Sequence, residues 1–236
     1  MAKDKGVSII TVTKRPAYIK NIFLNYDRQL WEKKELIIIV HNDHAPIEMY
    51  RRVAKRLPGV SVHQLPKEMS LGKCLNYGVE QSKYDHIAKF DDDDYYSPAY
   101  LTDAMRVFER TNADVIGKSS HYVWLEGKKL LALRSPEAEN QYVQILPGAT
   151  LVIRKHVFGK VRFSDRTVGE DSKFCRDCKE QGLKVYSAGR AHFIAIRRKG
   201  SRDHTWRISD SELLSGNVKI FPYVKNIYKF VSRDEA

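Results

Sequence analysis

Four consecutive aspartates, Asp91 to Asp94, are the strongest chemical signal in this chain of 236 residues. They follow directly on a short apolar stretch that ends at Phe90. Adjacent carboxylates repel one another, so the run needs positive charge beside it, which a divalent cation supplies compactly. Mg²⁺ and Mn²⁺ prefer oxygen ligands and complete their shells with water and phosphate oxygens. The run therefore predicts a site for Mn²⁺ or Mg²⁺ and a phosphorylated ligand.

Alternate residues of an extended chain point the same way, which places Asp91 and Asp93 on one side. We predict that these two share the metal, with Asp93 in direct contact, and that Asp92 or Asp94 supports them. The alternative is a solvated acidic turn that caps the helix expected after Pro98, because acidic residues also favour helix N-termini. The apolar strand before the run and the basic remainder of the chain favour the metal site.

The elements that must position this run alternate between strands and helices. Buried strands are expected over residues 7–12, 36–40, 60–65 and 86–90, and helices over 16–30, 47–57, 70–82 and 98–110. This alternation predicts a parallel sheet covered on both faces, with ligands bound beyond the carboxyl ends of its strands. Further along, a helix is expected over 170–182, a hairpin turn at Glu126-Gly127, and strands over 114–117, 121–125, 129–134, 148–153, 183–187 and 192–197.

Taken together, these motifs resemble family 2 glycosyltransferases, which have the GT-A fold. Residues 90–101, Phe-Asp-Asp-Asp-Asp-Tyr-Tyr-Ser-Pro-Ala-Tyr-Leu, are similar to the family's metal-binding segment of strand, Asp-x-Asp-Asp, three residues, Pro, two residues and Leu. Residues 7–16 and 35–40 resemble its first two strands, 72–78 its Gly-x-x-x-Asn-x-Gly helix, and 169–171 its Glu-Asp motif. A fainter likeness is to bacterial surface-polysaccharide and spore-coat sugar transferases.

The resemblance implies an α/β fold of GT-A type, in which a Rossmann-like nucleotide-binding half is fused to a mixed-sheet acceptor half. The whole chain is expected to form one domain. Its nucleotide-binding half covers residues 1–112, its acceptor half covers 113–208, and a C-terminal appendage covers 209–236.

The resemblance also implies roles for individual residues. Asp171 would be the general base that deprotonates the acceptor hydroxyl, and Glu170 would orient the acceptor; the alternative for both is simple capping of the helix that they begin. His204 is expected as a third metal ligand in preference to His192, because a loop residue reaches the site more easily. Residues expected to contact the nucleotide sugar are Thr11, Thr13, Arg15, Asn42, Asp43, Lys73, Asn76, Asp91, Asp92 and Arg198.

Some of these residues depart from the family pattern. Asn42 stands where the family shows the Asp that contacts the base, which leaves uridine specificity open; the alternative is an Asx-type turn. Lys73 is the stand-in for an Arg that the family often has at position 75, which is Leu75 here. The alternative for Lys73 and Arg15 is ordinary solvated charge.

Composition limits the class of protein and its partners. The 41 basic and 29 acidic residues give a net charge of +12, which favours an anionic partner. Cys74, Cys175 and Cys178 are too few for a disulfide framework and suggest a reducing compartment, and the last two are expected in the core rather than on zinc. The longest aliphatic run, 36–40, is far too short for a membrane span. We therefore expect a cytoplasmic protein, with contact at a membrane surface still possible.

These observations predict a metal-dependent, inverting glycosyltransferase. It would move a sugar from a nucleotide-diphosphate sugar, with UDP as the expected nucleotide, to a hydroxyl of a carbohydrate or glycoconjugate acceptor. One alternative is a sugar nucleotidyltransferase, although Thr13-Lys14-Arg15-Pro16 lacks that class's glycines. The other is an inactive basic module that binds polyanions. No nucleic-acid partner is expected, because the acidic run would repel phosphates and no nucleic-acid module is recognised.

Overall fold

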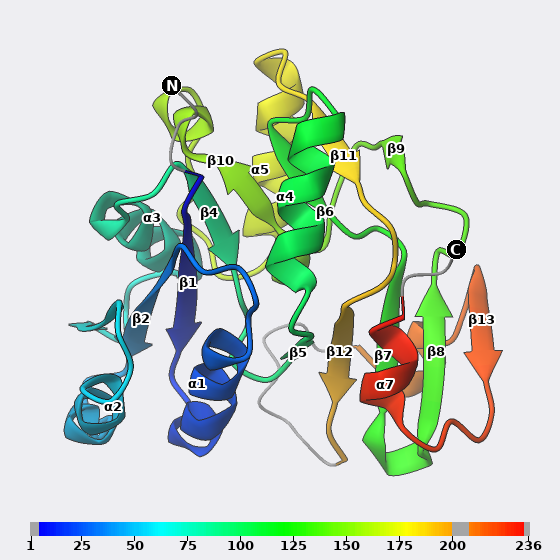
Figure 1. Ribbon diagram of the computed structural model, residues 1–236, viewed down its shortest axis with the longest axis horizontal. Coiled ribbons are helices and arrows are strands. Elements are labelled where there is room, and N and C mark those ends of the chain that lie inside the picture. The colour runs from blue at the N-terminus through cyan, green and yellow to red at the C-terminus, as the bar shows by residue number, and fades with distance from the viewer. Residues whose placement is uncertain (1–4, 200–207, 234–236) are drawn as a thin grey trace.

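Two sheets organise the computed structural model, which describes residues 5–199 and 208–233 (Figure 1). The larger has eight strands in the order β3-β2-β1-β4-β10-β6-β11-β9, and the smaller has five in the order β13-β8-β7-β12-β5. The strands of the larger sheet are β1 (Val7–Thr13), β2 (Lys34–His41), β3 (Val60–Leu65), β4 (His86–Lys89), β6 (Val115–Gly117), β9 (Gln141–Tyr142), β10 (Val152–Arg154) and β11 (Val185–Ser187). Those of the smaller are β5 (Tyr95–Tyr96), β7 (His121–Leu125), β8 (Leu130–Arg134), β12 (Phe193–Arg197) and β13 (Val218–Phe221).

The first five helices cover the two faces of the larger sheet, and the last two pack against the smaller sheet. In chain order, the helices of the described residues are α1 (Ile19–Asp27), α2 (Ile47–Ala54), α3 (Leu71–Gln81), α4 (Tyr100–Arg110), α5 (Glu170–Glu180), α6 (Asp210–Leu213) and α7 (Ile227–Val231). Short 3₁₀ turns lie at η1 (Pro16–Tyr18), η2 (Glu126–Lys128), η3 (Gly148–Thr150) and η4 (Lys155–Gly159). No helix within the described ranges is long and apolar enough to cross a bilayer.

Side-chain alternation along the central strands builds two cores. On β2, Leu36 and Ile38 face α1, α2 and α4, whereas Ile37 and Ile39 face α3 and α5. Successive residues of a strand point to opposite faces, so a continuous run of large aliphatic side chains can fill both layers. The predicted parallel core is confirmed: β1 pairs in parallel with β2 and β4, and β2 pairs in parallel with β3.

The two predicted halves share the larger sheet. Strand β10 lies antiparallel between β4 and β6, so strands from beyond residue 113 extend the sheet that the first half begins. The smaller sheet also joins both halves, because β5 pairs with β12 directly after the acidic run. The acidic run thus lies where the two sheets meet.

The expected strand over 148–153 is wrong in its first half. Residues 148–150 form the 3₁₀ turn η3, and only Val152–Arg154 is a strand. The amide and hydroxyl of Thr150 both donate to the carbonyl of Pro147, at 3.0 and 2.8 Å, and this closes a turn in place of a sheet ladder. Smaller differences are the 3₁₀ start of the helix after Pro16 and the 3₁₀ turn η2 in the β7–β8 hairpin.

Candidate active site

The carboxyl ends of β1 and β4 meet at the acidic run. The strands are parallel neighbours with Ile10 opposite Lys89, and both point downward in Figure 1. Residues just beyond β1 therefore reach those just beyond β4. The Thr13 hydroxyl donates to Asp92 Oδ2 at 2.5 Å and accepts from the Arg15 amide at 3.1 Å. Thr13 thereby joins the predicted nucleotide loop to the run.

Arg15 neutralises two of the four aspartates. Its Nε lies 3.1 Å from Asp92 Oδ2, its Nη2 bonds Asp92 Oδ1, and the same Nη2 lies 3.0 Å from Asp93 Oδ2. Burial lowers the pKa of Arg15, but the hydrogen bond and charge of Asp92 and the charge of Asp93 outweigh it, so the pKa is raised. Burial raises the pKa of Asp92, while the hydrogen bond from Arg15 acts in the opposite direction. The run thus has the counter-charge that its composition requires.

Tyr18 contacts two arginines that lie beside the acidic run. Its ring centroid is 4.5 Å from the guanidinium carbon of Arg15 and 4.6 Å from that of Arg198. Arg198 Nη1 also donates to the Asp93 carbonyl at 2.8 Å. Cation–π contact holds both guanidinium groups next to the carboxylates, which is where a diphosphate would need positive charge.

Two asparagines one helical turn apart fix the backbone of the run. Asn21 Nδ2 donates to the carbonyls of Asp92 and Asp94 at 2.8 and 2.9 Å, and Asn25 Nδ2 donates to that of Asp94 at 2.9 Å. The Asp94 carboxylate accepts from the Ile196 amide at 2.9 Å, which ties the run to β12. Burial, followed by the charges of Asp93 and Asp91, raises the pKa of Asp94 well above its ordinary value. Asp94 therefore supports the run from within the protein.

Lys89, the last residue of β4, is a buried lysine beneath the acidic run. Its Nζ forms an ion pair with Asp91 Oδ1, and its side chain is 7% exposed whereas that of Asp91 is 37% exposed. Burial lowers the pKa of Lys89, but the negative charges of Asp91, Glu170 and Asp171 outweigh it and raise the pKa. One ammonium group thus lies within electrostatic range of carboxylates from both acidic motifs.

The second motif begins α5. Gly169 precedes the helix at φ +75°, and Glu170 is buried while Asp171 is partly exposed. The Asp171 carboxylate accepts from the amide of Gly148 at 2.8 Å and from that of Ser172 at 2.6 Å. A Cβ on Gly148 would lie 2.9 Å from Asp171 Oδ2, so glycine allows this close approach. The turn η3 thereby fixes the orientation of Asp171.

A hydrogen-bonded path links the two motifs. The Tyr96 hydroxyl accepts from the Asp91 amide at 2.8 Å and donates to the Ala149 carbonyl at 2.6 Å. Ala149 follows Gly148, whose amide bonds Asp171. The Tyr96 ring stacks on Phe90 at a centroid distance of 3.7 Å, which holds the hydroxyl in place. The spacing between the acidic run and Asp171 is therefore set by Tyr96 and η3.

Glu170 has the clearest pKa shift among the predicted catalytic residues. Burial raises its pKa to about 7, the charge of Lys89 lowers it, and the charges of Asp171 and Asp91 raise it. Buried carboxylates with shifted pKa values cluster at functional sites. Glu170 is thus close to half-protonated near neutral pH, beside the predicted base.

Other predicted contacts lie apart from this network. Asn42 Oδ1 accepts from the His44 amide at 2.9 Å, which is the Asx-type turn weighed as its alternative, and Asp43 is exposed. Lys73 pairs with Asp165 at 2.7 Å on the exposed surface. Contact of Asn42, Asp43 and Lys73 with a nucleotide remains a prediction.

Asn76 and Thr11 are each surrounded by other parts of the protein. Asn76 donates to the Phe163 carbonyl at 2.8 Å and accepts from its amide at 3.1 Å, so it anchors the segment that leads to α5. Thr11 is buried within β1. Their predicted contact with the nucleotide sugar is not tested by these positions.

The two histidines considered as metal ligands, His192 and His204, differ in what the structure describes of them. His192 is buried, and its Nδ1 lies 2.9 Å from the Ser97 hydroxyl, so it supports the segment before α4. His204 lies outside the described residues, and its role as a metal ligand remains a prediction. Cys175 and Cys178 are buried in the core on the α5 face, as expected.

Sequence reasoning missed Tyr18, Asn21, Lys89, Tyr96 and Gly148. Two of them carried a signal. Lys89 is the only charge in the strand His86-Ile87-Ala88-Lys89, and Asn21 pairs with Asn25 at a spacing of one helical turn. The partners of Tyr96 and Gly148 lie across the fold, so their local sequence gave no such signal.

Residues 8–159 match the family described as Glycosyl transferase family 2. The chain belongs to glycosyl transferase family 2. No curated protein matches it in sequence.

Solved structures of S. aureus TarS are similar in fold. The structure of TarS 1-349 in complex with UDP-GlcNAc has a TM-score of 0.65 at 19% identity, over 83% of this chain and 60% of that chain. TarS 1-349 alone has a TM-score of 0.64 at 16% identity, over 81% and 60%. This chain thus spans less than two thirds of those structures. Together with the family match, the likeness confirms the predicted GT-A fold.

Proposed function

We propose that this family 2 protein is a metal-dependent, inverting glycosyltransferase that moves a sugar from a nucleotide-diphosphate sugar to an acceptor hydroxyl. The observation that carries the proposal is the path from Asp91 through Tyr96 and η3 to Asp171. It joins a site suited to a diphosphate to a carboxylate suited to an acceptor, in one rigid arrangement. The same path favours an active enzyme over an inactive polyanion-binding module, which would need no such spacing.

The residues present fit a divalent cation. Asp91 and Asp93 offer hard oxygen ligands. The Arg15 guanidinium lies 3.0 Å from the Asp93 carboxylate, which indicates that a positive charge is stable beside this residue. No three side chains of His, Cys, Asp and Glu converge as a ligand set within residues 5–199 and 208–233. That is compatible with Mg²⁺ or Mn²⁺, which take few protein ligands and complete their shells with phosphate and water. A bound cation would offset charge that develops on the departing diphosphate.

The chain's own residues would carry the rest of the reaction. Arg15 and Arg198 would hold phosphate oxygens with charge-assisted hydrogen bonds. Asp171 would take the proton of the acceptor hydroxyl as that oxygen bonds to the anomeric carbon and the bond from that carbon to the diphosphate oxygen breaks. The amides of Gly148 and Ser172 would orient the carboxylate while its remaining lone pairs stay available to the acceptor.

A uridine nucleotide sugar is the first donor class to test. TarS 1-349 was solved in complex with UDP-GlcNAc and with UDP, which supports the choice without extending it to this chain's own sugar. Asn42 at the predicted base position leaves room for another nucleotide, because an amide both donates and accepts. A carbohydrate or glycoconjugate is the proposed acceptor class, and the cytoplasm is the proposed compartment.

The test is nucleotide release from a panel of UDP-, GDP-, CDP- and dTDP-sugars in the presence of Mn²⁺, with and without EDTA. We expect release from one class, lost with EDTA and in Asp93→Ala, and kept in Asp85→Ala, which alters an exposed carboxylate outside the network. Because turnover without an acceptor can be too slow to detect, binding of the free nucleotides is also measured by calorimetry. Absence of any nucleotide binding would overturn the proposal. Release of pyrophosphate from a nucleoside triphosphate and a sugar phosphate would instead support the nucleotidyltransferase alternative.

A further inference from the structure

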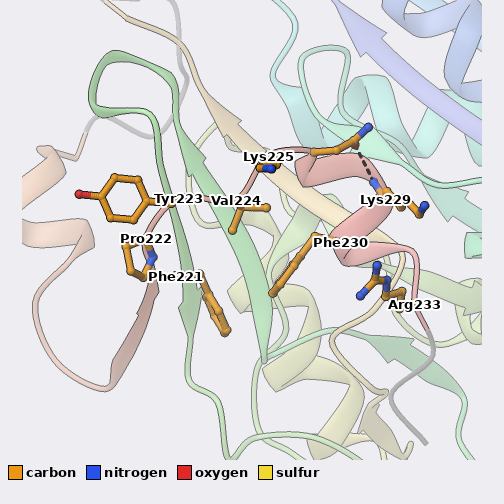
Figure 2. Close-up of a pocket in the computed structure, with 9 residues that line it drawn as sticks. Phe221, Pro222, Tyr223, Val224, Lys225, Lys229, Phe230 and Arg233 are labelled. Atoms are coloured by element: carbon orange, nitrogen blue, oxygen red, sulfur yellow. Dashed lines mark hydrogen bonds between the residues drawn. The ribbon is translucent and has the colours of Figure 1, made fainter.

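A hollow in the smaller sheet's C-terminal region lies apart from the acidic run. The C-terminal hollow, as we name it, encloses about 410 Å³ between the end of β13 and α7. Its apolar lining includes Phe221, Val224 and Phe230, and its basic lining is Lys225, Lys229 and Arg233 (Figure 2). No acidic residue among residues 5–199 and 208–233 lines it. We propose that the C-terminal hollow binds an anionic glycan chain, namely the acceptor of the proposed transfer, on which this inference rests.

Charge is the first argument. Between Leu213 and Arg233 the sequence has four basic residues and no acidic one. Ion pairs to described carboxylates engage Arg15, Lys89 and Lys118 elsewhere, but none engages Lys225, Lys229 or Arg233 among the described residues. Asp234 and Glu235, which follow in the sequence, lie outside those residues. Unneutralised cations around a concave surface attract an anionic ligand.

Exposed aromatic rings are the second argument. Tyr223 is 96% exposed at φ +60°, and in Figure 2 its ring points away from the basic side chains. A sugar ring presents an apolar C–H face that packs on an aromatic ring, whereas its hydroxyls remain hydrated. A tyrosine held outward beside a cationic hollow therefore suits a charged saccharide. A membrane is a poorer fit, because Phe221 and Phe230 are partly buried against each other, at 5.2 Å, and do not protrude.

Two contacts join α7, which lines the C-terminal hollow, to segments next to the candidate active site. Tyr228 on α7 packs on Tyr95 at a centroid distance of 4.5 Å, and Tyr95 directly follows Asp94. The amide of His192 donates to the Val231 carbonyl at 2.7 Å, which fixes α7 against the start of β12. Helix α7 thus lies against the segment that directly follows the acidic run. A long anionic acceptor would be held at both places.

The test is binding of a hyaluronan oligosaccharide, a carboxylated glycan, measured by calorimetry at low and high salt. We expect the triple variant Lys225→Glu, Lys229→Glu and Arg233→Glu to bind at least about tenfold more weakly, because each substitution removes a contact with the anionic glycan. The salt dependence of binding should decrease for the same reason. The matched control reverses three exposed charges elsewhere, Lys55→Glu, Arg56→Glu and Lys67→Glu, and should change affinity less than about twofold because net charge alone is altered. Tyr223→Ala should weaken hyaluronan but not inorganic polyphosphate.

Three outcomes would overturn the inference. Equal losses in the triple variant and its control would mean that net charge alone attracts the glycan. Loss of binding to vesicles of phosphatidylcholine and phosphatidylglycerol, with hyaluronan binding unchanged, would make the hollow a membrane contact. No effect of Tyr223→Ala would leave a plain polyanion site. Nucleotide release without acceptor tests the proposed function separately. The triple variant should retain this release.

Discussion

The two acidic motifs carry their charge in opposite ways. Asp92 to Asp94 lie at a strand end and are largely buried, with Arg15 and backbone amides as partners. Asp171 lies at a helix start, is partly exposed, and accepts hydrogen bonds from the backbone amides of Gly148 and Ser172. The first arrangement stabilises several negative charges at once, which suits a cation and a diphosphate. The second orients one carboxylate toward solvent, which suits proton transfer.

The largest expected effect is at Asp93. Asp93→Asn should lower nucleotide-sugar turnover by about a thousandfold or more, because it removes both a proposed metal ligand and the negative charge that a catalytic cation would need. It should also abolish the Mn²⁺ dependence of nucleotide binding, measured by calorimetry. The control is Asp85→Asn, which alters an exposed carboxylate just before β4. Mn²⁺-dependent binding that survives in Asp93→Asn would place the cation elsewhere.

Asp171 should behave differently. Asp171→Asn is expected to lower kcat by about 10²–10³-fold, in the range for a lost general base, while nucleotide affinity and its metal dependence stay unchanged. The reason is that Asp171 bonds the amides of Gly148 and Ser172, whereas Arg15 pairs with Asp92 and Asp93. If Asp171→Asn weakened nucleotide binding as strongly as Asp93→Asn, the division between the two motifs would be wrong.

Lys89 is the charge that the two motifs have in common. Lys89→Met should lower stability by about 3–5 kcal/mol, since removal of the buried ammonium leaves the buried Glu170 and its neighbours Asp91 and Asp171 without that counter-charge. Part of that loss should return in the double variant Lys89→Met and Glu170→Gln, which removes one of those carboxylates. Urea unfolding of the four proteins of this cycle gives the coupling energy. Additive effects would show that Lys89 and Glu170 do not interact.

Tyr96 tests the spacing between the motifs. Tyr96→Phe keeps the ring stacked on Phe90 but removes the hydroxyl between the Asp91 amide and the Ala149 carbonyl. We expect a loss of about 1–3 kcal/mol in stability, because buried polar groups lose their partner. We also expect kcat to fall about tenfold with KM for the donor unchanged, as for a misplaced catalytic group. Lower stability with unchanged kcat would make Tyr96 purely structural.

The sequence was sufficient for the parts of the fold that local pattern determines. Strands such as 36–40 follow from apolar β-branched runs, and Ser70 caps α3 as expected, accepting from the Lys73 amide at 3.2 Å. The acidic run's position follows from its place after a strand. The η3 turn did not follow, because residues 148–153 have the composition of a strand and only contacts with distant residues fold their first half otherwise. The pairing of Arg15 with Asp92 likewise joins residues 77 apart.

The last prediction concerns how stability depends on pH through Glu170. Its pKa rises from an ordinary 4.5 to about 7 on folding, so the folded protein favours the protonated form. This contribution to stability is fully present below about pH 4.5 and is lost as pH rises through about 7, with a ceiling of about 3 kcal/mol at about 1.4 kcal/mol per pKa unit. Glu170→Gln, which cannot ionise, should lack this loss. Its unfolding free energy in EDTA, relative to the original protein, should therefore increase between about pH 5 and pH 8.

Glu180→Gln, at the exposed end of the same helix, should give no such trend. A flat difference for Glu170→Gln would mean that Lys89 already holds Glu170 ionised, and the two motifs would then be more alike in charge than their burial indicates.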